Sequence, residues 1–104
     1  HCLACQRRTG SVFGVQARYA EAQVTVSGAA SEYVRVGDEG ARLRFRFCPT
    51  CGATVCYTVD DCPGVVAIPV GAFADPGHAP PRVSVHEVRM HPWVGLPAGI
   101  EHHA

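Results

Sequence analysis

Two pairs of cysteines with the same spacing carry most of the chemistry that this sequence can do. Cys2 and Cys5 form one C-x-x-C pair, and Cys48 and Cys51 form another. Thiolates at this spacing can bind one metal ion from a tight turn, and they can also act as a redox pair. Cysteines can instead form disulfides in exported proteins, but this spacing favours metal binding. We therefore expect four thiolate metal ligands.

The second pair lies in the sequence CPTCG, residues 48–52, between two apolar runs. This pattern is typical of a zinc knuckle, in which the glycine supplies the backbone angle that the turn needs. Two buried free cysteines or a disulfide are the weaker interpretation, because Pro49 and Gly52 are the residues that a knuckle turn favours. Structural zinc takes four protein ligands. Spacing alone therefore predicts a single ribbon-like site that joins both pairs on one zinc ion.

The first pair is followed closely by Arg7 and Arg8. Their positive charges favour the thiolate form of nearby cysteines, which serves either metal binding or redox chemistry. A thioredoxin-like redox pair is the less favoured interpretation, because the βαβ context of that motif is missing.

The other cysteines and two internal histidines are weaker candidates for function. Cys56 lies in the middle of an apolar run, where a lone cysteine is usually a small buried residue. Cys62 follows two aspartates and is a poor nucleophile in that acidic turn. His86 and His91 are expected at the surface or hydrogen-bonded in the core, and His86 is the better functional candidate of the two.

The elements that must position these residues are mostly strands. Alternating apolar residues predict strands over residues 11–17, 23–27, 32–36, 43–48, 54–59, 65–70 and 82–90, with only short helical turns, such as one over 19–22. Residues 74–77 and the prolines that follow predict an irregular loop. Trp93 and the tail around it are expected to pack back on the sheet, and His102 and His103 are expected at a frayed end.

Three arginines alternate with apolar residues in the predicted strand 43–48 and just before it. Arg42, Arg44 and Arg46 must therefore share one face of the strand. We interpret this row as a solvated sheet face, because a ligand-binding arginine row would need a concave partner.

Composition limits the class of protein. The chain has 104 residues, a formal net charge of zero and only arginine among its nine Lys and Arg residues, so no basic excess indicates nucleic acid. No apolar run approaches the ~20 residues of a membrane helix. The first residues do not have the form of a signal peptide. A single small domain in the cytoplasm is the expectation.

Two segments resemble a known family. Residues 1–13, HCLACQRRTGSVF, and residues 45–52, FRFCPTCG, resemble the glutathione-dependent formaldehyde-activating enzymes and centromere protein V. The likeness continues through residues 63–71, Asp75–Pro76, His86 and Pro92–Trp93, and so covers essentially the whole chain. The resemblance implies a mainly β, antiparallel zinc domain of β-tent type.

The resemblance also implies two metal sites instead of one. In the family, a structural zinc is shared between an early C-x-C hairpin and the knuckle, which assigns Cys48 and Cys51 to that site. A second zinc lies on the cysteines of C-H-C-x-x-C, which assigns Cys2 and Cys5 to a catalytic site. The hairpin is absent here, and the first cysteine of the second motif would fall just before His1. We expect residues 1–104 to form a single zinc-binding domain that lacks the family's N-terminal segment.

The implied activity is that of a zinc-dependent carbon–sulfur lyase or thiol–aldehyde adduct synthase. Glutathione, or a similar small thiol, would add to a small aldehyde such as formaldehyde to give an S-hydroxymethylglutathione-like product. Arg7 and Arg8 would pair with the substrate's carboxylates, although two solvated arginines stay an equal alternative. Ser11 would line the same cleft, as would Phe13 unless it belongs to the core.

Two rival functions stay open at this point. One is a noncatalytic binding module that zinc only stabilises, and the weaker one is a redox switch at Cys2 and Cys5.

Overall fold

The computed structural model describes all 104 residues. They form two compact units, each with its own secondary structure. The sheet unit is Gln16–Ala74, and the terminal unit combines His1–Val15 with Asp75–Ala104. None of the helices is both long enough and apolar enough to cross a membrane.

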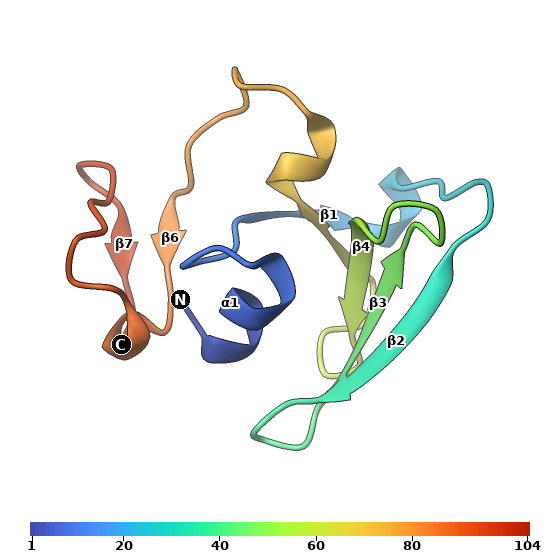
Figure 1. Cartoon of the computed structure of the whole chain (residues 1–104), viewed down its shortest axis with the longest axis horizontal. Helices are drawn as coiled ribbons and strands as arrows, with labels where there is room; N and C mark the ends of the chain where they lie inside the picture. Colours follow the sequence, from blue (N-terminus) through green and yellow to red (C-terminus); the bar gives the residue numbers. More distant parts are fainter. The chain divides into compact units, whose positions relative to one another are not determined.

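The sheet unit is built on one five-stranded antiparallel sheet in the order β1-β5-β4-β3-β2 (Figure 1). Strands β2 to β5 follow one another as a meander, and β1 pairs with β5 at the opposite edge from β2. The strands are β1 (Gln16–Ala20), β2 (Ser31–Val36), β3 (Arg42–Phe47), β4 (Thr54–Val59) and β5 (Val65–Pro69). The predicted mainly β, antiparallel fold is confirmed, whereas the β-tent assignment stays a prediction.

One face of this sheet carries the core of the unit. Phe45, Tyr57 and Ala67 are buried and lie opposite one another on β3, β4 and β5, with Leu43 and Val59 packed against them. The rings of Phe45 and Tyr57 lie 4.9 Å apart between centroids. Because side chains alternate between faces, the neighbouring residues of each strand point to the other face.

The terminal unit contains the only α-helix, α1 (Leu3–Thr9), and a small parallel pair of strands, β6 (Val83–Ser84) and β7 (Glu101–His102). Gly10 ends α1 in a left-handed conformation, with φ 69°, and its N–H group bonds to the carbonyl of Gln6. Ser84 and Ile100 are the buried residues of this unit. Three 3-10 turns complete the chain: η1 (Glu21–Gln23), η2 (Val70–Phe73) and η3 (Glu87–Arg89).

Four of the predicted strands are confirmed to within one residue at each end, namely those over residues 32–36, 43–48, 54–59 and 65–70. The strand predicted over 23–27 is wrong. Val24 instead closes the turn η1 by donating its N–H group to Glu21, and no further strand lies beside β1 to pair with this segment. The predicted strand over 11–17 is also wrong in its first half, because the chain leaves Gly10 as a loop and β1 begins at Gln16.

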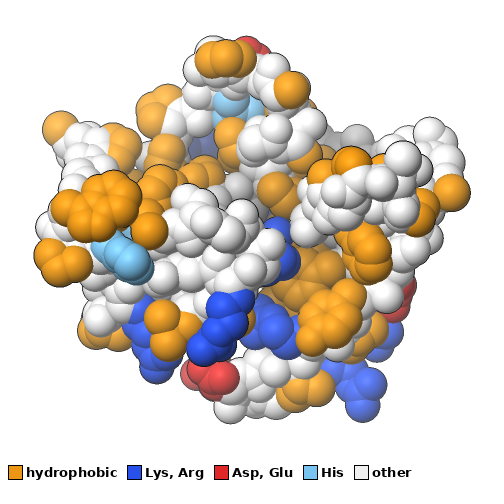
Figure 2. Space-filling model, in the orientation of Figure 1, with side chains coloured by type: hydrophobic (Ala, Val, Ile, Leu, Met, Phe, Trp, Pro, Cys, Tyr) orange, Lys and Arg blue, Asp and Glu red, His pale blue; other side chains and the backbone are white.

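The C-terminal part differs from the prediction as well. The strand predicted over 82–90 stops at Ser84, since His86 has a left-handed backbone with φ 58° and leads into η3. His102 belongs to β7 instead of a frayed end, and the N–H group of His103 bonds to the Ser84 carbonyl. Apolar side chains reach the surface in many places (Figure 2). Trp93, which was expected to pack back on the sheet, is 73% exposed.

Candidate functional site

The first cysteine pair is built into the start of α1. Cys2 is the N-cap residue, and its sulfur accepts a hydrogen bond of 3.2 Å from the backbone N–H group of Cys5. Residues three apart share a face of a helix, and the two sulfurs lie 2.6 Å from each other. Both side chains are half-buried. The start of the helix therefore brings the two predicted thiol ligands together.

The electrostatic environment of this pair differs from the prediction. Burial raises the pKa of the Cys5 thiol, and the hydrogen bond and charge of Cys2 raise it further. The nearby charge of Arg8 lowers this pKa, but by less. Arg8 thus acts in the expected direction, but the expected net lowering of the thiol pKa is wrong for Cys5, because loss of solvation and the neighbouring Cys2 outweigh the positive charge.

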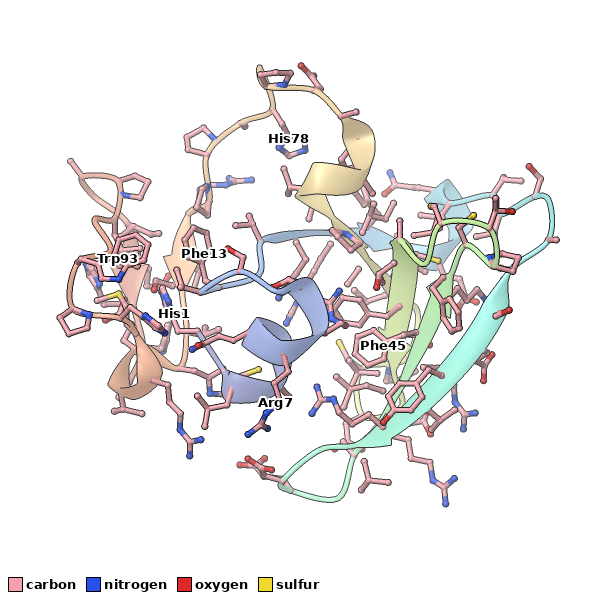
Figure 3. All side chains as sticks on the ribbon, in the orientation of Figure 1. His1, Arg7, Phe13, Phe45, His78 and Trp93 are labelled. Atoms are coloured by element: carbon pink, nitrogen blue, oxygen red, sulfur yellow. The ribbon has the colours of Figure 1, made fainter.

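The two arginines after the pair do not have equivalent positions. Arg8 lies one helical turn after Cys5, and both side chains lie beside Gly14. A Cβ atom added at Gly14 would be 3.6 Å from the Arg8 guanidinium and 3.7 Å from the Cys5 Cβ. Arg7 is exposed and points away from His1 and Phe13 (Figure 3). The structure thus places Arg8, and not Arg7, beside the thiols.

Ser11 lies in the bend after α1. Its backbone N–H group bonds to the hydroxyl of Thr9, which in turn donates to the Cys5 carbonyl, and its own side chain is exposed. A role for Ser11 in substrate binding stays a prediction.

Gln6 links the helix to the segment around Arg89 and His91. Sequence reasoning did not single out this residue, because a glutamine carries no sign of such a role. Its amide group donates to the carbonyls of His1, at 2.9 Å, and Arg89, at 3.2 Å. Its carbonyl oxygen lies 3.1 Å from Nε2 of His91. Every hydrogen-bonding atom of this side chain is thereby used within the terminal unit, which holds the start of α1 in place.

His1 extends the same network. Its ring packs against Phe13 at 5.7 Å (Figure 3), and its Nε2 lies 3.1 Å from the hydroxyl of the buried Ser84. Nδ1 of His1 is buried without a hydrogen-bond partner. Hydrogen bonds from Ser84 and then from His102 hold the pKa of Glu87 below its usual range. His1 therefore joins the start of the chain to the Ser84–Val85 segment, through its ring and through its amino group, which donates to the Val85 carbonyl.

The second cysteine pair occupies the turn between β3 and β4. The turn is closed by hydrogen bonds from the Gly52 N–H group to the Cys48 carbonyl, 2.8 Å, and from the Cys48 N–H group to the Ala53 carbonyl, 2.9 Å. Gly52 has φ 78°, the conformation expected of it. Backbone hydrogen bonds from Cys51 and Thr50 lower the pKa of the Cys48 thiol. The turn has the form of a knuckle, and the lowered pKa of Cys48 favours its thiolate form.

The donor chemistry of both pairs fits a soft divalent ion such as zinc, since each presents two thiols from one turn. Each pair presents two thiols, and no group of three or more Cys, His, Asp or Glu side chains suited to a metal occurs in the structure. His86 is exposed in the left-handed position before η3. Cys56 is buried, 5% exposed, as predicted.

Comparison with known proteins adds one match. The sequence model described as "Glutathione-dependent formaldehyde-activating enzyme" matches residues 1–89, a range that contains both cysteine pairs. No curated protein matches the chain.

Proposed function

Because this chain belongs to the glutathione-dependent formaldehyde-activating enzyme family, we propose that it promotes the addition of glutathione to formaldehyde. The glutathione sulfur attacks the carbonyl carbon, a C–S bond forms, and the electron pair of the C=O π bond moves to oxygen, which takes up the proton lost by the thiol. The product is S-hydroxymethylglutathione. The reverse reaction breaks the same C–S bond, and in that direction the protein is a carbon–sulfur lyase.

Cys2 and Cys5 are the proposed ligands of a catalytic zinc. The observation that carries this assignment is their convergence at the N-terminus of α1, with sulfurs 2.6 Å apart. Zinc, when bound, favours the thiolate form of a thiol that coordinates it. The clamp of Gln6 onto His1, Arg89 and His91 fixes the position of this pair, so that the site does not have to be ordered at each turnover.

Arg8 is the proposed contact for a glutathione carboxylate. Its charge already acts on Cys5, and a guanidinium can bind a carboxylate through two parallel hydrogen bonds. Arg7 lies on another side of the helix and contributes less.

Cys48 and Cys51 are the proposed ligands of a structural zinc. The lowered pKa of Cys48 supports thiolate coordination in the knuckle. Thiolate ligands and a reduced thiol substrate both suit a reducing compartment, so we also propose a cytoplasmic location.

The activity is tested by exchange spectroscopy with ¹³C-formaldehyde and glutathione, which measures formation and breakdown of the adduct above the spontaneous rate. We expect the purified protein to accelerate exchange and Cys5→Ser to return it to the spontaneous rate. Cys62→Ser is the matched control, because Cys62 lies outside both pairs and should leave the acceleration intact. Metal binding with no acceleration across several thiols and aldehydes would overturn the enzyme assignment in favour of a noncatalytic zinc module.

A second function has one observation in its favour, the proximity of the Cys2 and Cys5 sulfurs in the thiol form. A redox pair would form a reversible disulfide under mild oxidants. Resistance of the metal-loaded protein to such oxidants would exclude it.

A further inference from the structure

The sheet unit contains a pocket that the cysteine chemistry does not use. It lies on the face of the sheet opposite to the Phe45 core, where Arg46 of β3 pairs with Cys56 of β4. The chain after β1 covers this face, and Val24 and Val26 form a wall over it. The pocket has a volume of about 230 Å³. Arg44 and Arg46 of the arginine row therefore line a concave surface, while the row as a whole is open to solvent, as expected.

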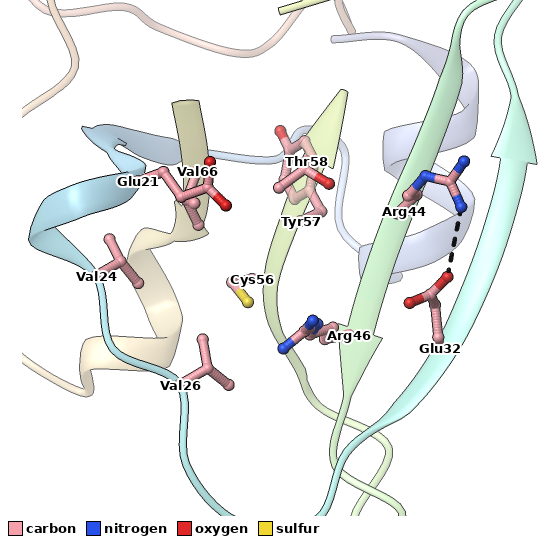
Figure 4. Close-up of a pocket in the computed structure, with 10 residues that line it drawn as sticks. All are labelled: Glu21, Val24, Val26, Glu32, Arg44, Arg46, Cys56, Tyr57, Thr58 and Val66. Carbon is pink, nitrogen blue, oxygen red and sulfur yellow. Dashed lines mark ion pairs between the residues drawn. The ribbon is translucent and has the colours of Figure 1, made fainter. Parts of the chain in front are cut away.

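One side of the pocket is apolar. Val24 and Val26 point inward from the loop, and Val66 of β5 with the buried Cys56 lies across from them (Figure 4). These side chains offer a small aliphatic surface that is partly shielded from water. An aliphatic group of a few carbons would gain from being buried against it.

The charged residues of the pocket are not all neutralised by one another. The Arg44 guanidinium is held by Asp60 through two hydrogen bonds of 2.9 and 3.1 Å, and it lies 3.8 Å from Glu32. Arg46 has no hydrogen bond or ion pair in the structure, and its guanidinium points toward the middle of the pocket (Figure 4). Glu21, which precedes Val24 and Val26 in the segment that covers the pocket, also has a carboxylate without a partner.

The pocket combines an unpaired cation, an unpaired carboxylate and an aliphatic wall. A ligand that matches it carries an anionic group, a cationic group and a small aliphatic group. We propose that this pocket binds the zwitterionic head group of an α-amino acid. The ligand's carboxylate pairs with Arg46, its ammonium group faces Glu21, and its aliphatic part lies on Val24, Val26 and Val66. The pairing of Arg46 with a carboxylate is charge-assisted and can be bidentate, while exposure of the pocket to solvent keeps the affinity low.

The proposal is tested with L-valine as the probe, by following the methyl NMR signals of Val24, Val26 and Val66. Isovalerate lacks the ammonium group and isobutylamine lacks the carboxylate. Each should therefore bind at least about tenfold more weakly than L-valine, as measured by the concentration that half-saturates the shifts. Equal binding of all three compounds would show an apolar pocket without charge recognition and would overturn the proposal. Absence of shifts with L-valine and with glutathione would overturn it too.

The head group could come from a free amino acid or from glutathione, whose γ-glutamyl end carries the same zwitterion. A second titration with glutathione distinguishes these two sources. Shifts with glutathione at the three valines, stronger than those with L-valine, assign the pocket to the peptide. The reverse order assigns it to free amino acids.

Arg46→Gln keeps hydrogen-bonding capacity but removes the charge, and we expect it to weaken binding about tenfold or more. Arg42→Gln is the matched control, since Arg42 lies on the same strand outside the pocket, and it should bind as the unmodified protein does. Equal affinity of the two variants would overturn the role of Arg46. The inference does not rest on the proposed function, because loss of valine binding and loss of Cys5-dependent formaldehyde exchange are measured separately.

Discussion

The two C-x-x-C pairs have the same spacing and opposite surroundings. Cys2 and Cys5 lie at the start of a helix, where burial raises the pKa of Cys5. Cys48, half-buried, and Cys51, exposed, lie in a hairpin turn, where backbone N–H groups lower the pKa of Cys48. The comparison teaches that spacing sets which sulfurs can meet, while the backbone around them sets how readily they ionise.

The largest expected difference between the pairs is in stability. Cys48→Ser should lower the midpoint of thermal unfolding by more than about 10 °C in the zinc-loaded protein, because a structural metal contributes directly to folding. Cys2→Ser should lower it by less, since its site is assigned to catalysis. Calorimetry in the presence and absence of a chelator measures both, and Cys62→Ser serves as the control. A larger loss for Cys2→Ser would reverse the assignment of the two sites.

Two glycines sharpen the comparison, since each pair has one nearby in a left-handed conformation. Gly52→Ala and Gly10→Ala should each cost about 1–2 kcal/mol, because alanine is strained at φ 78° and 69° and neither position has a crowded neighbour. Only Gly52→Ala should also weaken zinc binding at the knuckle. Denaturant unfolding and zinc competition titrations separate the two effects, and a change in zinc affinity with Gly10→Ala would contradict the local character of the knuckle.

Thiol reactivity in the metal-free protein compares the pairs more directly. The pKa of Cys48 is lowered and that of Cys5 is raised, so at pH 8 a larger fraction of Cys48 is thiolate. Alkylation at Cys48 should therefore be several-fold faster, and the difference should shrink as the pH rises above both values. Peptide mass spectrometry after timed alkylation gives both rates. Faster alkylation of Cys5 at pH 8 would contradict the electrostatic difference.

The smallest predicted effect concerns the two arginines. Arg8→Gln removes a charge that lowers the pKa of Cys5, so alkylation of Cys5 at pH 8 should slow by about twofold. Arg7→Gln is the matched change on the same helix and should have no effect. Equal slowing by both variants would mean that net charge matters and position does not.

The sequence predicted the sheet better than the terminal unit. Strong alternation, as in Arg42–Phe47, predicted β3, whereas β5 (Val65–Pro69) was predicted by a continuous apolar run. The helix α1 was missed because it spans only 7 residues and has a cysteine as its N-cap instead of a more usual capping residue. Val24 and Val26 alternate like a strand, but they form the wall of a pocket.

The cysteine pairs could be predicted from spacing, but their surroundings could not. Gln6 contacts Arg89 and His91, which lie more than 80 positions away in the sequence, as well as the nearby His1. No local pattern encodes such contacts. The difference between Arg7 and Arg8 likewise depends on the helix, since only a helical turn places Arg8 on the side of Cys5.

Zinc content per chain tests the central claim that the two pairs serve separate sites. We would measure it on the purified protein and on its Cys5→Ser and Cys48→Ser variants. The account predicts that each substitution releases only the zinc of its own pair and leaves the other in place. Release of all the zinc by either substitution would contradict it, and would show that the four cysteines bind a single shared ion.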